Sequence, residues 1–254
     1  MPWAGGRNVA LTPPGMLQHL SPRWLLRALL ARRGSIIANL GRDSRHDLGV
    51  VRETRMLVPL LMGDAAALHI QACVRAARQL DGDMAEAGVL MGGSARLICE
   101  TKGDTLLHLF DVFETLQLPV RTPRTPAESE IRAHFGDVHG CRAQVERLLA
   151  PYGGVCLHQG IFPETTIGLE DARFSFVHID MDLPQSVWEA LIFFHPRMIA
   201  GGIMIGDDYN DPGVRGTFAE FFAGSQDTLI GLPWGQVMVV RQGAEPGPII
   251  SPPP

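Results

Sequence analysis

The sequence predicts an α/β fold in which helices cover both faces of a doubly wound, mostly parallel sheet of seven strands. From residue 84 onward, short apolar runs alternate with segments of helical character, a pattern typical of a parallel sheet. Two later apolar runs, at residues 228–232 and 236–241, are separated by Pro-Trp-Gly, which indicates a hairpin. The sheet should therefore consist of five parallel strands followed by an antiparallel pair.

The individual elements follow from the same patterns. Apolar runs of strand length, rich in β-branched and aromatic residues, predict parallel strands at 84–90, 106–110, 155–158 and 174–179, and in the run after Gly201-Gly202. Helices are expected from Ser94, near residues 141–149 and over residues 185–195. A strand, a helix and a strand in one parallel sheet form a right-handed crossover, so the last two of these strands should be neighbours.

Residues 1–80 are expected to form an N-terminal helical extension that caps the ligand site or contributes to a homodimer. The first 20 residues should be irregular, residues 24–31 should be helical, and the apolar spacing in residues 55–80 fits one or two helices. Packing on the domain or on a partner subunit is the expected role of residues 24–31, with a membrane-surface helix as the alternative. The main domain is expected at residues 81–242, with a mobile lid at 119–139. The proline-rich tail at 243–254 should be disordered.

Composition narrows the class of protein. With 254 residues, 46% hydrophobic and 19% charged, the chain fits a soluble globular protein. Its net charge of −5 argues against a nucleic-acid partner, which would require clustered Lys and Arg. The four cysteines lack metal-ligand spacing and are expected to be reduced thiols, and no apolar run is long enough to span a membrane. We therefore expect a cytoplasmic protein with a small-molecule ligand and no membrane partner.

Two neighbouring strands of the predicted sheet each end in a pair of carboxylates. Asp180 and Asp182 follow the run at 174–179, and Asp207 and Asp208 follow the next strand. Because parallel strands end at the same edge of a sheet, where α/β proteins bind ligands, these four side chains should converge. Crowded carboxylates repel one another, and a hard divalent cation relieves the repulsion. The alternative interpretation is a helix N-cap or an ordinary turn at each pair.

A glycine-rich turn follows the first strand, in the sequence EAGVLMGGS of residues 86–94. Glycines allow a ligand to approach the backbone, and Ser94 is expected to cap the following helix. The next strand ends in Asp111, about 20 residues after the turn, where an acid can bind ribose hydroxyls. A tight turn and a helix cap are the respective structural alternatives. Because no phosphate-binding Lys accompanies the glycines, the pattern favours an adenosine ligand without phosphates, namely S-adenosylmethionine.

Several motifs, in order over about residues 80–225, resemble the macrocin-type O-methyltransferases. They are GVLMGGSA at 88–95, LFDVFETL at 109–116, GIFPET at 160–165, HIDMDL at 178–183, GGIMIGDDYN at 201–210 and PGVR at 212–215. Enzymes of this family methylate sugar hydroxyls of natural products such as macrolide and aminocoumarin antibiotics. The resemblance implies a Rossmann-like class I methyltransferase domain at 81–242 that takes S-adenosylmethionine and Mg²⁺.

The resemblance also implies roles for individual residues. Asp180, Asp207 and Asp208 would hold Mg²⁺, and Asp182 would be the general base. The implied cofactor contacts are Glu86, Gly88, Gly92, Gly93, Ser94, Asp111 and Gly160. The chain departs from the family at Pro184, where an aromatic residue is usual, and at Met91, where a polar residue is common. Pro184 suits the first turn of a helix, but its presence leaves the substrate contacts of that helix open.

Other interpretations remain open at the level of sequence. The four acids could serve a metal-dependent hydrolase, although this leaves Asp111 and the glycine turn without a role. A non-catalytic binding protein could keep the same fold. His139, His158 and His178 are alternative bases, although a structural role is favoured for each of them. Phe221, Phe222 and Trp234 are expected to belong to the core rather than to a substrate platform.

Overall fold

The computed structural model describes residues 29–30, 39–113 and 140–243. The chain divides into two compact units, Met1–Asp43 and Ser44–Pro254, and the sheet with its covering helices belongs to the second. The irregular N-terminus, the lid and nearly all of the proline-rich tail predicted from the sequence lie outside the described residues. So does the segment at 24–31 apart from residues 29–30, which are helical. The domain boundary expected after residue 80 stays a prediction.

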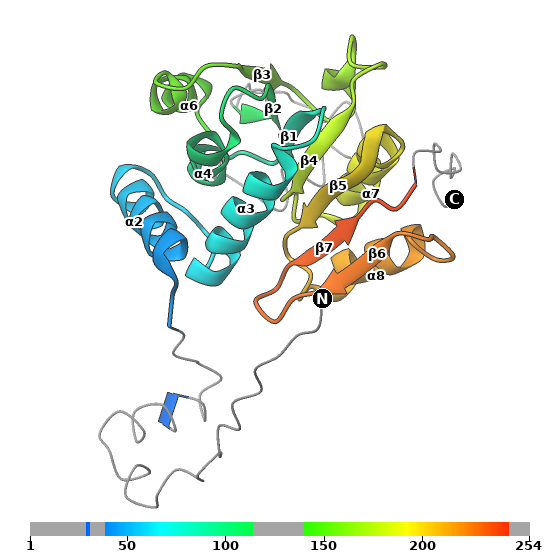
Figure 1. Ribbon diagram of the computed structural model, residues 1–254. Helices are drawn as coiled ribbons and strands as arrows, with labels where there is room; N and C mark the ends of the chain where they lie inside the picture. Colours follow the sequence, from blue (N-terminus) through cyan, green and yellow to red (C-terminus); the bar gives the residue numbers. More distant parts are fainter. Residues whose placement is uncertain (1–28, 31–38, 114–139, 244–254) are drawn as a thin grey trace, which may run out of the picture. The chain divides into compact units, whose positions relative to one another are not determined.

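A seven-stranded sheet forms the centre of the second unit (Figure 1). Its spatial order is β3-β2-β1-β4-β5-β7-β6. The first five strands are parallel, and β7 runs antiparallel to both β5 and β6, as the hairpin signal predicted. The strands are β1 (Asp83–Ala87), β2 (Leu107–Asp111), β3 (Val155–Gln159), β4 (Phe174–Ile179), β5 (Met198–Gly206), β6 (Thr228–Gly231) and β7 (Val237–Val240).

Helices cover both faces of the sheet, which confirms the doubly wound arrangement (Figure 1). Side chains of α3 (Asp64–Ala77), α4 (Gly93–Lys102) and α6 (Arg142–Leu149) form one apolar core with one face. Side chains of α7 (Pro184–Phe194) and α8 (Pro212–Phe221) form the other, which is rich in Phe. The remaining elements are α2 (Arg42–Leu57), which packs on α3 and α4, and two short 3-10 helices, η3 (Glu164–Thr166) and η4 (His195–Arg197).

Several boundaries differ from the sequence prediction for local reasons. β1 ends at Ala87 rather than at residue 90, because Gly88 has a φ of 89° and turns the chain out of the sheet. Ser94 does not cap α4: Gly92 occupies the N-cap position in a left-handed conformation, and Ser94 lies inside the first turn. β5 begins at Met198, before the glycine pair that was expected to precede it.

The helix α8 was not predicted, although the sequence carries its start signal. The side chain of Asp211 accepts hydrogen bonds from the amides of Gly213 (2.7 Å) and Val214 (3.0 Å), and Pro212 occupies the first turn. Pro184 takes the same place in α7, as expected. The Asp-Asp pair at 207–208 is therefore not the cap of the helix that follows it, since Asp211 has that role.

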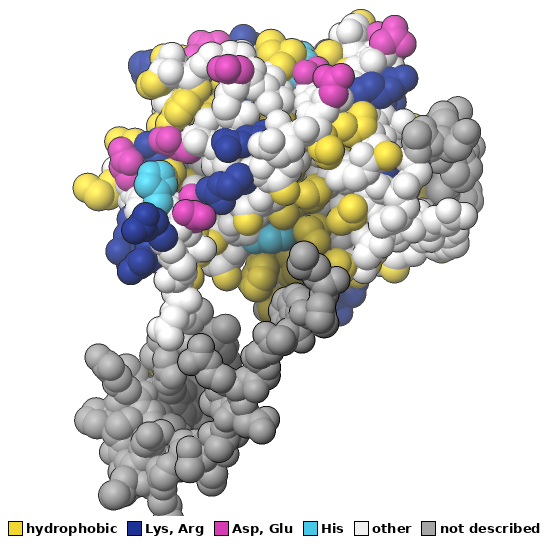
Figure 2. Space-filling view, in the orientation of Figure 1, with side chains coloured by type: hydrophobic (Ala, Val, Ile, Leu, Met, Phe, Trp, Pro, Cys, Tyr) yellow, Lys and Arg dark blue, Asp and Glu magenta, His cyan; other side chains and the backbone are white. Residues whose placement is uncertain are grey.

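The surface of the described residues mixes charged and apolar groups. In Figure 2, Lys and Arg side chains are interspersed with Asp and Glu, and hydrophobic side chains are grouped near the middle of the visible face. All four cysteines are free thiols, as expected, and Cys73 and Cys99 are buried. Within the described part of the chain, every helix is too short or too polar to cross a membrane.

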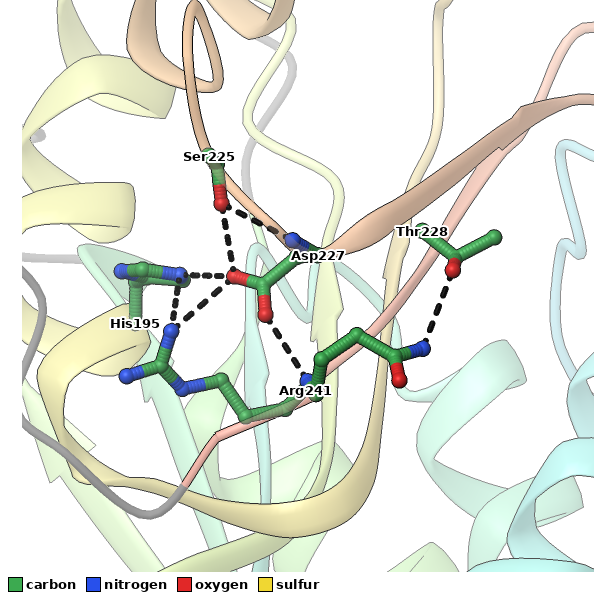
Figure 3. A network of polar contacts seen from close by, with 6 residues as sticks. His195, Ser225, Asp227, Thr228 and Arg241 are labelled. Atoms are coloured by element: carbon green, nitrogen blue, oxygen red, sulfur yellow. Dashed lines mark hydrogen bonds and ion pairs between the residues drawn. The ribbon is translucent and has the colours of Figure 1, made fainter.

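A buried polar network joins the two antiparallel strands to the end of α7 (Figure 3). The carboxylate of Asp227, only 1% exposed, lies 2.6 Å from Nε2 of His195 and 3.0 Å from Nη1 of Arg241. Ser225 Oγ donates to the same carboxylate oxygen, and the amide of Gln242 donates to the other. Since β6 begins and β7 ends here, the network fixes the hairpin at the edge of the sheet opposite the strand ends that carry the aspartate pairs.

We expect Asp227→Asn to lower the free energy of unfolding by about 3 kcal/mol, the usual cost of removing one partner of a buried ion pair. Asparagine keeps the shape of the side chain but removes the charge that faces Arg241. Urea unfolding of the variant measures the loss. The exposed acid Glu220 on α8 supplies the control, and Glu220→Gln should change stability by less than about 0.5 kcal/mol. Equal effects of the two substitutions would contradict a structural role for the network.

Candidate functional site

A cavity of about 540 Å³ opens at the carboxyl edge of the sheet. Its walls come from the segments that follow β1, β2, β4 and β5, together with the loop between α2 and α3 and the turn between β6 and β7. Predicted site residues that line it are Gly88, Gly93, Ser94, Asp111, Gly160, Asp180, Asp182, Asp207 and Asp208. The glycine turn and the aspartate pairs, which lie far apart in the sequence, therefore face one cavity.

The four carboxylates converge as the strand pattern predicted. Ligand atoms of Asp180, Asp182 and Asp208 all lie within 4.8 Å of one another, and so do those of His178, Asp180 and Asp207. Asp180 belongs to both groups, so it lies at the centre of the cluster. The predicted ligand set of Asp180, Asp207 and Asp208 is thus divided between two overlapping groups. Carboxylate oxygens at this spacing suit a hard divalent cation, so the donor set fits Mg²⁺.

The pKa shifts of three carboxyl groups in the cluster differ in direction. Burial raises the pKa of Asp180 well above its usual range, and the charges of Asp207 and Asp208 add to this effect. Burial, with the charge and hydrogen bond of Asp182, raises the pKa of Asp208 to about 7. Burial alone would also raise the pKa of Asp207, but the nearby His178 imidazolium and hydrogen bonds from Gln236 and the amide of Asp208 outweigh it and lower that pKa. Asp207 is therefore ionised at neutral pH, whereas Asp208 titrates there.

Asp182 and Asp208 also share an unusual backbone conformation. Their φ angles are 58° and 53°, in the left-handed region that non-glycine residues rarely adopt. Asp182 lies in the segment that follows Ile179, the last residue of β4, and Asp208 in the segment that follows Gly206, the last residue of β5, and both line the cavity. Strain of this kind, about 1 kcal/mol or more per residue, is typical of functional sites.

A completely buried ion pair lies beneath the cluster. Nδ1 of His178 is 2.8 Å from Oε1 of Glu86, and its Nε2 is 3.7 Å from Oδ2 of Asp207. Burial alone would lower the pKa of His178, but contacts with Asp207 and Glu86 raise it to about 10. His178 is therefore an imidazolium that links β1 to the end of β5. This supports the structural role favoured for it over that of a general base.

Glu86 and Gly92 are placed differently from the other predicted cofactor contacts. Glu86 is fully buried on β1 and pairs with His178, and it does not line the cavity. Gly92 also lies behind the wall: its φ is 83°, and a Cβ there would meet the side chains of Leu148 and Val145 at 3.1 and 3.4 Å. Neither residue lines the cavity, and their predicted cofactor contacts stay predictions.

Asp111 faces the cavity but is already engaged. Its Oδ2 accepts hydrogen bonds from the amides of Val89 (2.7 Å) and Leu90 (2.8 Å), and its Oδ1 accepts from the amide of Phe113 (2.7 Å). The acid at the end of β2 thus anchors the glycine turn that follows β1. Its predicted contact with ribose hydroxyls stays a prediction, and its position in the cavity wall is compatible with it.

Sequence reasoning missed the cavity wall contributed by distant loops. Trp234 was expected in the core, but it is 38% exposed and lines the cavity, whereas Phe221 and Phe222 are buried as expected. Leu60, Leu61 and Met62 line it from the loop between α2 and α3. The only signal for Trp234 was its place in the predicted hairpin turn, since a turn at the carboxyl edge must lie near the end of β5.

His158 and His139 are the other two histidines that the sequence offered as alternative bases. His158 lies 3.0 Å from His108 and stacks on Phe110 at a ring-centroid distance of 4.5 Å, and it does not line the cavity. Its surroundings are those of a structural histidine. His139 lies outside the described residues.

A family model described as macrocin-O-methyltransferase (TylF) matches residues 41–230. A curated relative, the 8-demethyl-8-(2,3-dimethoxy-alpha-L-rhamnosyl)-tetracenomycin-C 4'-O-methyltransferase of Streptomyces olivaceus, is 30% identical over 153 residues. That match spans 56% of this chain and 59% of the relative, so it covers less than two thirds of the relative's length.

Solved structures of methyltransferases share the fold. The O-methyltransferase NovP matches with a TM-score of 0.56 and 22% identity, over 69% of this chain and 78% of that chain. A putative caffeoyl-CoA O-methyltransferase from Staphylococcus aureus matches with a TM-score of 0.51 and 14% identity, over 86% of this chain and 98% of that chain. The sheet order and these similarities show the predicted class I methyltransferase fold.

We expect Gly88→Ala to disrupt the site, because a Cβ at this position would lie 1.7 Å from the carbonyl oxygen of Asp180. Gly224→Ala is the matched control, since Gly224 also has a positive φ, 77°, but open space around it. The control should cost about 1 kcal/mol for the left-handed backbone alone, and Gly88→Ala about 4 kcal/mol or more. Urea unfolding of both variants measures the difference, and equal losses would contradict the steric argument.

Lowering the pH from about 8 to about 5 should increase the contribution of Asp208 to the stability of the cation-free protein. The pKa of Asp208 is raised to about 7 when folded, whereas an unfolded Asp titrates near about 3.9, so the folded state binds this proton more tightly. Stability is therefore gained as the pH falls through 7. Solvent screening of this half-buried group limits the gain to the order of 1 kcal/mol.

Urea unfolding at the two pH values, in the parent and in Asp208→Asn, measures this contribution. His178, whose pKa is raised to about 10, also binds its proton more tightly in the folded state. Between about pH 8 and about pH 6.5 it therefore adds stability as the pH falls, and it does so equally in both proteins. Relative to Asp208→Asn, the parent should gain stability as the pH falls from about 8 to about 5. An unchanged dependence would show that Asp208 does not titrate in this range.

Proposed function

The chain belongs to the macrocin-O-methyltransferase family, and on that premise we propose that it transfers a methyl group from S-adenosylmethionine to a sugar hydroxyl of a glycosylated natural product, with the help of Mg²⁺. The observation that carries the proposal is the convergence of the glycine turn and the four acids on one cavity. The curated relative, whose printed name describes a rhamnosyl tetracenomycin substrate, supports a sugar as the acceptor.

S-adenosylmethionine would lie against the segment that follows β1. Gly88, Gly93 and Ser94 line this part of the cavity, Asp111 anchors the turn, and Gly160 approaches from the end of β3. Because glycine has no side chain, S-adenosylmethionine can approach the backbone closely at Gly88 and Gly93. The first turn of α4 offers a favourable site for the polar groups of S-adenosylmethionine. Apolar contacts are available from Val89 and Phe162.

Asp180, Asp207 and Asp208, which line the same cavity, would hold Mg²⁺. When bound, the cation lowers the pKa of an acceptor hydroxyl and orients its oxygen. The pair of His178 and Glu86 supports the cluster from below, because the imidazolium offsets part of the negative charge of Asp207. Without a cation, Asp208 and Asp182 share a hydrogen bond, which a proton on Asp208 stabilises.

Asp182 would act as the general base. Its carboxylate lines the cavity beside Asp180, and the hydroxyl proton of the acceptor would pass to it as the oxygen attacks the sulfonium methyl group. A C–O bond forms and the C–S bond breaks, so that S-adenosylhomocysteine leaves. Holding both reactants in one cavity supplies a large part of the rate acceleration. The hydrolase considered as an alternative gives no role to the glycine turn.

We expect Asp180→Asn to nearly abolish methyl transfer, because Asp180 belongs to both groups of possible cation ligands, and to spare S-adenosylmethionine binding, because the glycine turn is unchanged. Calorimetry with S-adenosylmethionine and a transfer assay on a panel of glycosides test the two parts. The exposed acid Asp171 supplies the control, and Asp171→Asn should keep parental rates. Parental rates of Asp180→Asn in EDTA would refute the role of the metal, and failure of the parent to bind S-adenosylmethionine would refute the proposal.

Asp182→Asn separates a base from a cation ligand. If Asp182 is the base, the variant should bind Mn²⁺ with nearly parental affinity and lose turnover by roughly 10²-fold or more, the usual contribution of a positioned base. Electron paramagnetic resonance of free Mn²⁺ measures binding, and the transfer assay measures turnover. Loss of Mn²⁺ binding would instead assign Asp182 to the group of cation ligands with Asp180 and Asp208.

A further inference from the structure

Gln236 connects the acidic cluster to two aromatic side chains that sequence reasoning did not assign to the site. It is completely buried at the end of the turn between β6 and β7. Its Nε2 donates to Oδ2 of Asp207 at 3.2 Å. Its Oε1 accepts from Nε1 of Trp234 at 3.0 Å and lies 3.0 Å from Nδ1 of His69 on α3. Three of the four hydrogen-bonding positions of the amide therefore have these partners.

The orientation of this amide follows from its partners. An indole N–H can only donate, so the amide atom that faces Trp234 must be the oxygen. The nitrogen must then face Asp207, where the carboxylate can only accept. The same logic places the proton of His69 on Nδ1, because Oε1 of Gln236 cannot donate. Nε2 of His69 is then free to accept from the thiol of Cys73, 3.2 Å away.

The contact fixes one half of the Asp207 carboxylate. Oδ2 receives the Gln236 donor, and Oδ1 accepts from the amide of Asp208 at 3.1 Å. Each oxygen thus has a donor from the protein, which leaves the plane of the carboxylate little freedom to rotate. Hydrogen-bonded partners behind a metal-binding carboxylate orient it and commonly change metal affinity by about 10–100-fold when they are removed.

We propose that Gln236 is a positioning residue that holds Asp207 ready for the cation, with its amide orientation set jointly by Trp234 and His69. The inference rests on the proposed function, because it takes Asp207 as a cation ligand. Trp234 also lines the cavity, and its ring meets that of His69 edge to face at a centroid distance of 5.6 Å. The side-chain amide of Gln236 therefore connects Trp234 in the cavity wall to the carboxylate of Asp207.

The first test is Mn²⁺ binding by Gln236→Leu, followed by electron paramagnetic resonance in the presence of S-adenosylhomocysteine. Leucine has a similar volume but donates nothing to Asp207, so we expect affinity for Mn²⁺ to fall by about tenfold or more. The affinity for S-adenosylhomocysteine should stay within about threefold of the parent, because the glycine turn is untouched. Gln242→Leu is the matched control: Gln242 lies in the segment after β7, and its amide donates to Thr228 at 3.0 Å.

A second set of variants keeps Gln236 in place, in case Gln236→Leu does not fold. In Trp234→Phe and in His69→Phe, one donor still faces Oε1, so the amide should stay oriented and Mn²⁺ affinity should fall by no more than about threefold. In the double variant Oε1 has lost both donors, so only the carboxylate of Asp207 still holds the amide, and the amide is less firmly oriented. We expect the double variant to lose Mn²⁺ affinity by more than the product of the two single losses.

The outcomes separate this inference from the proposed function. Asp207→Asn should itself weaken Mn²⁺ binding. If it does, while Gln236→Leu and the double variant bind Mn²⁺ as the parent does, the positioning role is wrong and the proposed site stands. If Asp207→Asn also binds as the parent does, Asp207 is no cation ligand, and this inference is overturned together with that assignment. A purely structural role would lower the melting temperature of Gln236→Leu without changing its Mn²⁺ affinity.

Discussion

The site depends on hydrogen bonds that continue the sheet beyond the last residues of its central strands. The amide of Gly88 donates to the carbonyl of Phe110, that of Asp180 to Ala87, and that of Asp207 to Ile179, at 2.8–2.9 Å. Each bond fixes the first residue after one strand against a neighbouring strand. Because these residues are the ones that enter the cavity, the parallel register determines where the glycine turn and the two aspartate pairs lie relative to one another.

This register brings like charges together, and the structure offsets the repulsion with buried groups of opposite charge or donor character. His178 lies on β4 between Glu86 on β1 and Asp207 at the end of β5, so one imidazolium joins three neighbouring strands. Gln236 adds a neutral donor from the antiparallel side. Asp182 and Asp208 receive no comparable donors within the described part of the chain, and their left-handed backbone adds strain. The uncompensated charge is therefore concentrated on the side that faces the cavity.

The sequence predicts the parallel part of this arrangement well because the relevant signals are local. Apolar runs that end in Asp-x-Asp or Asp-Asp identify both the strands and the edge at which they stop, and strand adjacency then brings Asp180 and Asp207 together. Trp234 and Gln236 could not be placed in this way. Their contacts depend on β7 returning antiparallel beside β5, which pairs Gly206 with Val237, and on α3 supplying His69. The pairing of Glu86 with His178 could not be read from the sequence either, because it depends on the register of β1 against β4.

The acidic cluster consists of two overlapping groups of ligand atoms, and the pKa values of Asp207 in one group and Asp208 in the other are shifted in opposite directions. Asp207, surrounded by donors and an imidazolium, keeps its charge at neutral pH because its pKa is lowered. Asp208, paired with Asp182, has a pKa raised to about 7 by burial and by the charge and hydrogen bond of Asp182. A cation that approaches Asp180 therefore meets one carboxylate that is already charged and another that must release a proton. If Asp208 is a cation ligand as proposed, a bound cation would favour its charged form, so cation binding and proton release from Asp208 would be linked, and loss of the proton would free Asp182 from its hydrogen bond. In this way the cation that orients an acceptor hydroxyl would also free the carboxylate that accepts the proton of that hydroxyl.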